Sequence, residues 1–305
     1  MNCIRKLFKN IFAEFYIMNT LSISDSNKYL IKLLEKNKNF YICRLGIGPE
    51  TYTPFYFHNH NTLTGIPSNL IKGLDNNNGI YCNSIEEVKS YCDLYIRSIN
   101  ESTAMAAFPH AIIKEQLALH NKKTPILHNR VLEPFYCLNE DIKPWSHYLY
   151  GKKVLIVNPF VESFQKQIQN NFKMFKDDNK YIFHKDQQFV FYKSYVTSAG
   201  NHLHSNWIET FNIMKEDISK LDFDIALLGC GGYGLPLCNF IHKEMGKSTI
   251  YIGGGLQLLF GVMGKRWENL DFWKKLIQEN DCKFIRPQGD EILKNNARIE
   301  GGCFW

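Results

Sequence analysis

The chain lacks the cysteine spacing of a structural zinc site. Nine cysteines occur among its 305 residues, but no two of them form a C-x-x-C pattern, and several, such as Cys43 and Cys238, lie inside apolar runs. Cysteines in such surroundings are typical of reduced, buried small hydrophobic residues in a cytoplasmic protein. We therefore expect neither zinc nor a disulfide framework.

Other absences argue against further classes of protein. No run of 18 apolar residues occurs, so we expect no transmembrane helix. Lys and Arg number 36 against 30 Asp and Glu, and the net charge of +6 is spread along the chain, so without a dense basic stripe we do not expect nucleic acid as the main partner. The absence of a nucleophile elbow argues against covalent acyl chemistry. The slight positive balance suits an anionic substrate, such as a sugar nucleotide.

Segments of strand length alternate with helical segments along most of the chain. Residues 153–158 and 224–228 are short apolar runs, whereas residues 206–220 place their large apolar side chains on one helical face. Such alternation predicts an α/β fold, with a Rossmann-like, mainly parallel sheet and helices on both of its faces. We expect one domain over residues 23–305, and a boundary near residue 150 is the alternative.

Residues 1–22 are predicted to form a separate amphipathic helix. Apolar residues at positions 4, 7, 8, 11, 12 and 15 would share one face, beside Arg5, Lys6 and Lys9. A signal peptide would have a longer uninterrupted apolar core. We expect this face to dock on the domain or on a partner, because that is the commoner use of such helices. The alternative is a peripheral contact of residues 1–18 with the inner face of a membrane.

A glycine loop between two predicted strands is the most informative segment. A G-x-G-x-x-G pattern follows the strand at residues 224–228, and the next strand, residues 248–252, ends in three glycines. Glycines let the backbone approach a phosphate, and the helix that follows directs free amides at it. The alternative is that they only permit sharp turns. The candidate nucleotide-binding residues here are Gly229, Gly231, Gly232, Tyr233, Gly234, Gly253 and Gly254.

The same unit argues against NAD. Enzymes that bind NAD usually carry an Asp or Glu at the end of the second strand, where it holds the ribose hydroxyls. That position is a glycine in this chain. The unit therefore predicts a phosphate or nucleotide site of another kind.

Polar residues after other predicted strands are further site candidates, because ligands of open α/β sheets bind beyond the carboxyl ends of strands. Arg44, Gly46 and Glu50 follow the first strand. Glu50 is the candidate base, or a ligand of Mn²⁺ or Mg²⁺, unless it forms a salt bridge that fixes the loop. Asn158 and Glu162 follow the strand at residues 153–158.

Two cationic segments complete the set of candidates. His128, Arg130 and Glu133 follow a short strand, where Arg130 would clamp a phosphate unless it pairs with Glu133. Lys265 and Arg266 stand beside a tryptophan, one strand downstream of the glycine loop. Two cations beside an aromatic ring would hold a diphosphate and stack a base. The alternative is a solvated charge pair next to a buried ring.

Several sequence blocks carry a family resemblance. They are LEPFY at 132–136, VNPFVES at 157–163, GCGGYGLPL at 229–237, GGGLQLLFG at 253–261, GKRW at 264–267 and EGGCFW at 300–305. These blocks resemble a widespread family whose members are often encoded among surface-polysaccharide genes, and the similarity covers roughly residues 38–305.

A fainter similarity is to glycosyltransferases of the GT-D fold. Their first strand ends in an Arg-x-Gly-Asp-Gly-Glu type segment, whose Asp-x-Glu pair binds the metal that holds the sugar-nucleotide diphosphate. Arg44, Gly46 and Glu50 match this outline, whereas Ile47 stands where the aspartate would be.

The resemblance implies a cytoplasmic glycosyltransferase. It would transfer a sugar from a nucleotide sugar to a surface glycan or a lipid-linked acceptor. The diphosphate would lie at residues 231–234 and near Lys265 and Arg266, and Glu50 would be the metal ligand or base. The missing aspartate at position 47 favours the alternative, a non-catalytic nucleotide-binding or scaffold protein of a polysaccharide assembly complex.

Overall fold

The computed structural model describes residues 19–36, 38–109, 112–138 and 142–305. This part of the chain contains a seven-stranded, all-parallel sheet in the order β3-β2-β1-β7-β6-β4-β5. The predicted Rossmann-like α/β fold is confirmed. The strands are β1 (Tyr41–Arg44), β2 (Ala104–Ala107), β3 (Ile126–His128), β4 (Lys153–Asn158), β5 (Gln188–Lys193), β6 (Ile225–Leu228) and β7 (Ser248–Tyr251).

The strand order reverses twice near the middle of the sheet. From β1 the chain adds β2 and β3 outward on one side, whereas the other neighbour of β1 is the last strand, β7, with Ile42 opposite Ile250. Likewise β5 lies outside β4, and β6 lies on the other side of β4. Strands from before and after residue 150 therefore share one sheet. Ligands of open α/β sheets bind at such reversals, outside the carboxyl ends of the strands.

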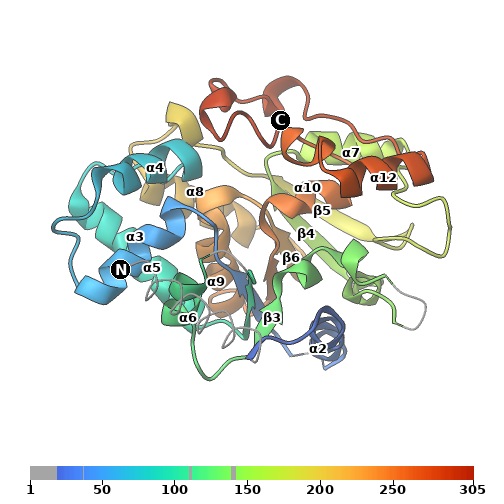
Figure 1. The fold of residues 1–305 in the computed structure, drawn as a ribbon, viewed down its shortest axis with the longest axis horizontal. Coiled ribbons are helices and arrows are strands. Elements are labelled where there is room, and N and C mark those ends of the chain that lie inside the picture. Colours follow the sequence, from blue (N-terminus) through green and yellow to red (C-terminus); the bar gives the residue numbers. More distant parts are fainter. Residues whose placement is uncertain (1–18, 37, 110–111, 139–141) are drawn as a thin grey trace, which may run out of the picture.

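Alternate side chains of each strand enter two separate cores. In β4, Val154 and Ile156 belong to one core, and Leu155 and Val157 belong to the other. Burial on both faces is typical of parallel sheets. The first face is covered by α2 (Ile23–Glu35), α7 (Val161–Gln169), α10 (Leu256–Leu259) and α12 (Asp271–Asn280). The second is covered by α3 (Pro49–His60), α4 (Ser68–Asn78), α5 (Ile85–Asn100), α6 (Ile113–Leu119), α8 (Trp207–Ser219) and α9 (Gly234–Lys243) (Figure 1).

Helix α3 is the element that brings Glu50 to the carboxyl edge of the sheet. It begins directly after the loop that follows β1, with Pro49 in its first turn, where the missing proline N–H costs nothing. Its sequence has no apolar stripe, and Pro54 lies inside it, so the sequence pattern did not predict it. Packing of Phe57 into the second core holds the helix in place.

The predicted helix over residues 1–22 falls mostly on residues 1–18, which lie outside the described part of the chain. At residue 22 the described chain supplies a cap instead, because the Ser22 hydroxyl accepts a hydrogen bond from the Asp25 amide at 3.0 Å and so begins α2. None of the helices described here is long and apolar enough to cross a membrane.

Candidate functional site

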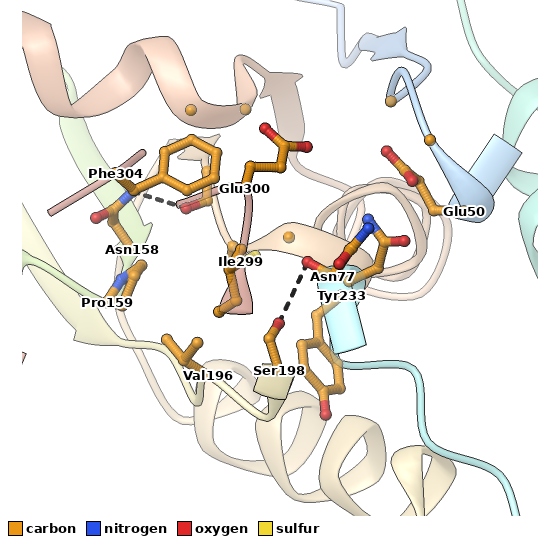
Figure 2. A pocket seen from close by; sticks show the side chains of 18 of the residues that line it. Glu50, Asn77, Asn158, Pro159, Val196, Ser198, Tyr233, Ile299, Glu300 and Phe304 are labelled. Atoms are coloured by element: carbon orange, nitrogen blue, oxygen red, sulfur yellow. Dashed lines mark hydrogen bonds between the residues drawn. The ribbon is translucent and has the colours of Figure 1, made fainter. Parts of the chain in front are cut away.

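A cavity of about 520 Å³ opens at the carboxyl edge of the sheet, above both reversals of strand order (Figure 2). The loops that follow β1, β4, β5, β6 and β7 line it, together with the end of α4 and the last residues of the chain. Its size is that of ordinary small-ligand pockets, which span roughly 300–1,000 Å³. In Figure 2, Glu50 lies on one side of the cavity, Asn158 and Phe304 lie on the other, and Glu300 lies between them.

The structure divides the predicted site residues into two groups. Those that line the cavity are Arg44, Gly46, Glu50, Asn158, Gly229, Gly231, Tyr233, Gly253, Gly254 and Arg266. Those outside its lining are His128, Arg130, Glu133, Glu162, Gly232, Gly234 and Lys265.

The carboxylate of Glu50 folds back over the loop after β1. A Cβ atom on Gly46 would lie 1.6 Å from Glu50 Oε1, and one on Gly48 would lie 2.5 Å from Oε2. A side chain at either position would displace the carboxylate from this place. The alternation of Gly46 and Gly48 in this loop therefore serves Glu50 directly.

The environment of Glu50 weakens its acidity. Its pKa is raised to about 7, mainly by burial and to a smaller extent by the charge of Glu300, against the lowering effects of its own backbone amide, of Arg44 and of the Asn78 side chain. Its Oε2 is buried and has no hydrogen-bond partner in the described part of the chain. Carboxylates tuned in this way, close to neutrality, are typical of catalytic acids and bases.

Arg44, the last residue of β1, presents a cation to the same side of the cavity. Its guanidinium packs against Gly253, where an added Cβ would lie 2.3 Å from Nη1, and its Cζ lies 4.8 Å from the centre of the Phe108 ring. No ion pair of Arg44 occurs among the described residues. The structure thus holds this guanidinium by packing, which leaves its charge available to an anion.

Arg266 presents a second cation from α11 (Lys265–Glu268). Its guanidinium lies 4.3 Å from the centre of the Phe304 ring, and Nη2 lies 3.1 Å from Cys303 Sγ. Nη2 also forms an ion pair with Glu300. The neighbouring Lys265 contributes its backbone amide, which donates to the Trp305 carbonyl at 3.2 Å.

The chain terminus forms one wall of the cavity, which the sequence motifs alone did not reveal. The Trp305 indole donates to the Glu291 carbonyl at 2.7 Å, and the Gln257 side chain donates to the Phe304 carbonyl at 3.2 Å. A Cβ on Gly254 would lie 2.6 Å from the Phe304 ring. Three sequence blocks, beginning at residues 253, 264 and 300, therefore fit together here.

Most glycines of the two glycine loops have a packing role. Added Cβ atoms would lie 2.6 Å from the Gly253 carbonyl at Gly229, 2.5 Å from Ile80 at Gly232 and 2.2 Å from Tyr251 at Gly234. Gly231 differs, because it is exposed, has a φ of 57° and would place a Cβ no closer than 3.6 Å to another atom. Only at Gly231 does the G-x-G-x-x-G turn offer open space to a ligand.

Asn158 fastens two of the loops together. Its amide nitrogen donates to the Gly229 carbonyl at 2.7 Å, and its carbonyl oxygen accepts from the Phe160 amide at 2.9 Å. Both bonds are buried. Asn158 therefore lines the cavity mainly as a support for the loop after β6.

The residues that follow β3 engage one another instead of the cavity. Arg130 Nη1 lies 3.4 Å from Glu133 and donates to the Tyr136 hydroxyl at 2.5 Å, and the His128 ring accepts from the Arg130 amide at 3.1 Å. Burial raises the pKa of Glu133, while Arg130 and Arg44 lower it. Glu162, after β4, forms an exposed ion pair with Lys193 at 2.7 Å.

The residues of the cavity fit a resident divalent cation poorly. No group of three or more His, Cys, Asp or Glu side chains gathers anywhere in the described ranges. The free oxygen of Glu50 is buried beside Gly48. A divalent cation held by the protein itself usually needs several oxygen ligands in reach at once.

Several lining residues were missed as candidates. Asn77 and Asn78 end α4, and Thr197 follows β5; the hydroxyl of the neighbouring Ser198 lies 3.4 Å from the Asn77 carbonyl (Figure 2). Their polar runs resemble ordinary turns in the sequence. The only sequence feature that pointed to Glu300 was its place in the EGGCFW block at residues 300–305.

Comparisons with protein-family models, with curated proteins and with solved structures found no match for this chain.

Proposed function

We propose that this protein is a glycosyltransferase that moves a sugar from a nucleotide sugar to a surface glycan or a lipid-linked acceptor. The observation that carries the proposal is the convergence of Glu50, Arg44, Arg266 and the open turn at Gly231 on one cavity. The sequence blocks that resemble the polysaccharide-associated family and the outline of the GT-D segment support the same class. The nature of the acceptor rests on that resemblance.

The donor would bind with its diphosphate between the two arginines. Both guanidinium groups line the cavity, and arginine pairs with phosphate oxygens through two parallel hydrogen bonds. The exposed backbone at Gly231 would add close contact to the same group. Pro159, Val196 and Phe304 provide an apolar wall for the nucleoside or the sugar (Figure 2).

Glu50 would act as the general base. It would accept the proton of the acceptor hydroxyl as that oxygen attacks the sugar carbon that bears the diphosphate. The bond from this carbon to the diphosphate breaks, and Arg44 and Arg266 stabilise the negative charge that develops on the leaving group. A base with a pKa of about 7 is half ionised at neutral pH, which suits this task.

We assign base chemistry rather than metal binding to Glu50, because the surrounding residues offer a divalent cation too few ligands. Mg²⁺ or Mn²⁺ would then enter with the donor phosphates if at all, since such ions keep water and phosphate ligands. Dependence on either ion stays a prediction for the assay.

A second candidate function is a non-catalytic nucleotide-binding or scaffold protein of a polysaccharide assembly complex. It is favoured by Ile47, which lines the cavity and is 50% exposed at the position where the related segment carries an aspartate. Incubation with a panel of nucleotide sugars, with and without Mn²⁺, separates the two functions. Release of nucleoside diphosphate supports the enzyme, whereas binding without release supports the scaffold.

A further inference from the structure

The ion pair between Arg266 and Glu300 occupies the place where a phosphate of the donor would bind. Both side chains line the cavity, and both keep solvent access, with 38% of Arg266 and 54% of Glu300 exposed. An anion can therefore reach the guanidinium, and the carboxylate already has access to solvent. A half-exposed ion pair is worth little by itself, so it can be exchanged.

Arg266 does not depend on Glu300 for its position. Its guanidinium stacks on Phe304 and contacts Cys303, and its backbone amide donates to the Cys303 carbonyl at 2.9 Å. The ring and the backbone contact do not involve the carboxylate, whereas the Cys303 thiol also donates to Glu300 Oε2 at 3.5 Å. Arg266 thus resembles Arg44, whose guanidinium is held by Phe108 and Gly253.

Glu300 itself is held in an unusual backbone conformation. Its φ is 49°, and Gly301 and Gly302 follow with φ values of 71° and 76°. This left-handed region is costly for a residue with a side chain, and such strain tends to persist where it serves a function. At this position the carboxylate lines the cavity and pairs with Arg266.

We propose that Glu300 is a placeholder for a phosphate group on Arg266, and that a diphosphate bound at Arg44 displaces it. A ligand with one anionic group can bind at Arg44 alone. A diphosphate engages Arg44 and also displaces Glu300 from Arg266. This inference rests on the proposed function for the identity of the ligand, but it requires no sugar transfer.

The test measures binding of inorganic pyrophosphate and of inorganic phosphate by calorimetry, in buffer with a chelator. Glu300→Gln removes the competing charge, so pyrophosphate should bind about fivefold more tightly than to the wild type. Phosphate affinity should change little. In an Arg266→Gln background the gain from Glu300→Gln should vanish, because the shared partner is gone. Glu216→Gln breaks an exposed ion pair outside the cavity lining and controls for the change in net charge.

Three results would overturn the inference. The first is that Glu300→Gln binds pyrophosphate no more tightly than the wild type. The second is that Glu216→Gln gives the same increase in pyrophosphate affinity as Glu300→Gln. The third is that none of the proteins binds pyrophosphate. Weaker binding that appears only when Mg²⁺ is added would assign Glu300 to cation binding instead. Failure of sugar transfer with the expected binding pattern intact would count against the enzyme and not against the placeholder.

Discussion

The loops after β1 and β3 carry the same residue types but put them to different uses. Each places an arginine and a glutamate at or just beyond a strand end. After β3, at the edge of the sheet, Arg130 and Glu133 pair with each other and with Tyr136. After β1, in the middle of the sheet, Glu50 folds onto two glycines and Arg44 packs against a third, without an ion pair between them in the described structure.

The difference follows from position in the sheet. β1 lies beside β7, where the strand order reverses, so the loops on either side leave a cavity between them. At the edge, Arg130 and Glu133 lie 3.4 Å apart and form an ion pair. Charged residues after a strand are thus available to a ligand only where the topology keeps them apart.

The largest difference between the two loops is expected when Glu50 and Glu133 are each neutralised. Glu50→Gln should lower sugar transfer by about 10² or more, because a general base contributes at least that much. Glu133→Gln, the matched control, should keep turnover close to the wild type. Steady-state kinetics with the identified donor measures both. Equal losses in the two variants would mean that the loops do not differ in function.

Glu50→Gln should gain stability while it loses activity. The raised pKa of Glu50 means that the folded protein binds a proton which the unfolded chain releases between pH 4.5 and about 7. The free energy of unfolding of the wild type should therefore fall as pH rises through this window. Glu50→Gln lacks this loss and should be more stable by about 1 to 3 kcal/mol at pH 8, with little difference at pH 4.

Denaturant unfolding at several pH values checks this prediction. Glu133→Gln provides a comparison within the second loop, since Arg130 offsets part of the rise in the pKa of Glu133. A Glu50→Gln protein that is less stable than the wild type at pH 8 would show that the carboxylate is well stabilised and is not a poised base.

Gly231 and Gly232, in the loop after β6, should respond differently to substitution, because one leaves space for a ligand and the other packs against its neighbours. Gly231→Ala should cost about 1 kcal/mol, for the left-handed backbone, and should weaken nucleotide binding. Gly232→Ala should cost about 2 kcal/mol, because its Cβ would lie 2.5 Å from Ile80, and should affect binding less. Thermal unfolding and calorimetry separate the two effects. Unchanged binding by a folded Gly231→Ala protein would make the turn purely structural.

The smallest effect is expected at the edge of the sheet. Arg130→Gln breaks a partly exposed ion pair and should lower the free energy of unfolding by less than about 1 kcal/mol. Donor affinity should not change, because Arg130 lies outside the cavity lining. A clear loss of donor affinity in this variant would place the loop after β3 within the site.

The fold was predictable because its signals are local. Apolar runs such as Val154–Val157 and the glycine turn after β6 determine a parallel α/β sheet by themselves. Helix α3 was not predictable from periodicity, since it has no apolar stripe and contains Pro54. Glu50 lies in the first turn of α3, so the position of this candidate base could not be predicted from the sequence either.

The candidate site was predictable in part, for a related reason. Arg44, Glu50 and Gly231 follow strands, and the rule for open sheets identifies such positions. The sequence did not distinguish Arg130 from Arg44, because strand order in the sheet decides which of them faces a cavity. Glu300 is brought to the cavity by contacts between segments far apart in the chain, which no local pattern reports.

Thermal unfolding of the wild type, Arg44→Gln and Arg130→Gln with a panel of nucleotide sugars tests whether the cavity beside β1 binds a nucleotide sugar. At a hundred times its dissociation constant, a true donor should stabilise the wild type and Arg130→Gln by about 2.7 kcal/mol. The same concentration should stabilise Arg44→Gln far less. If no nucleotide sugar stabilises the wild type, or if one stabilises all three proteins equally, the cavity beside β1 is not a nucleotide-sugar site.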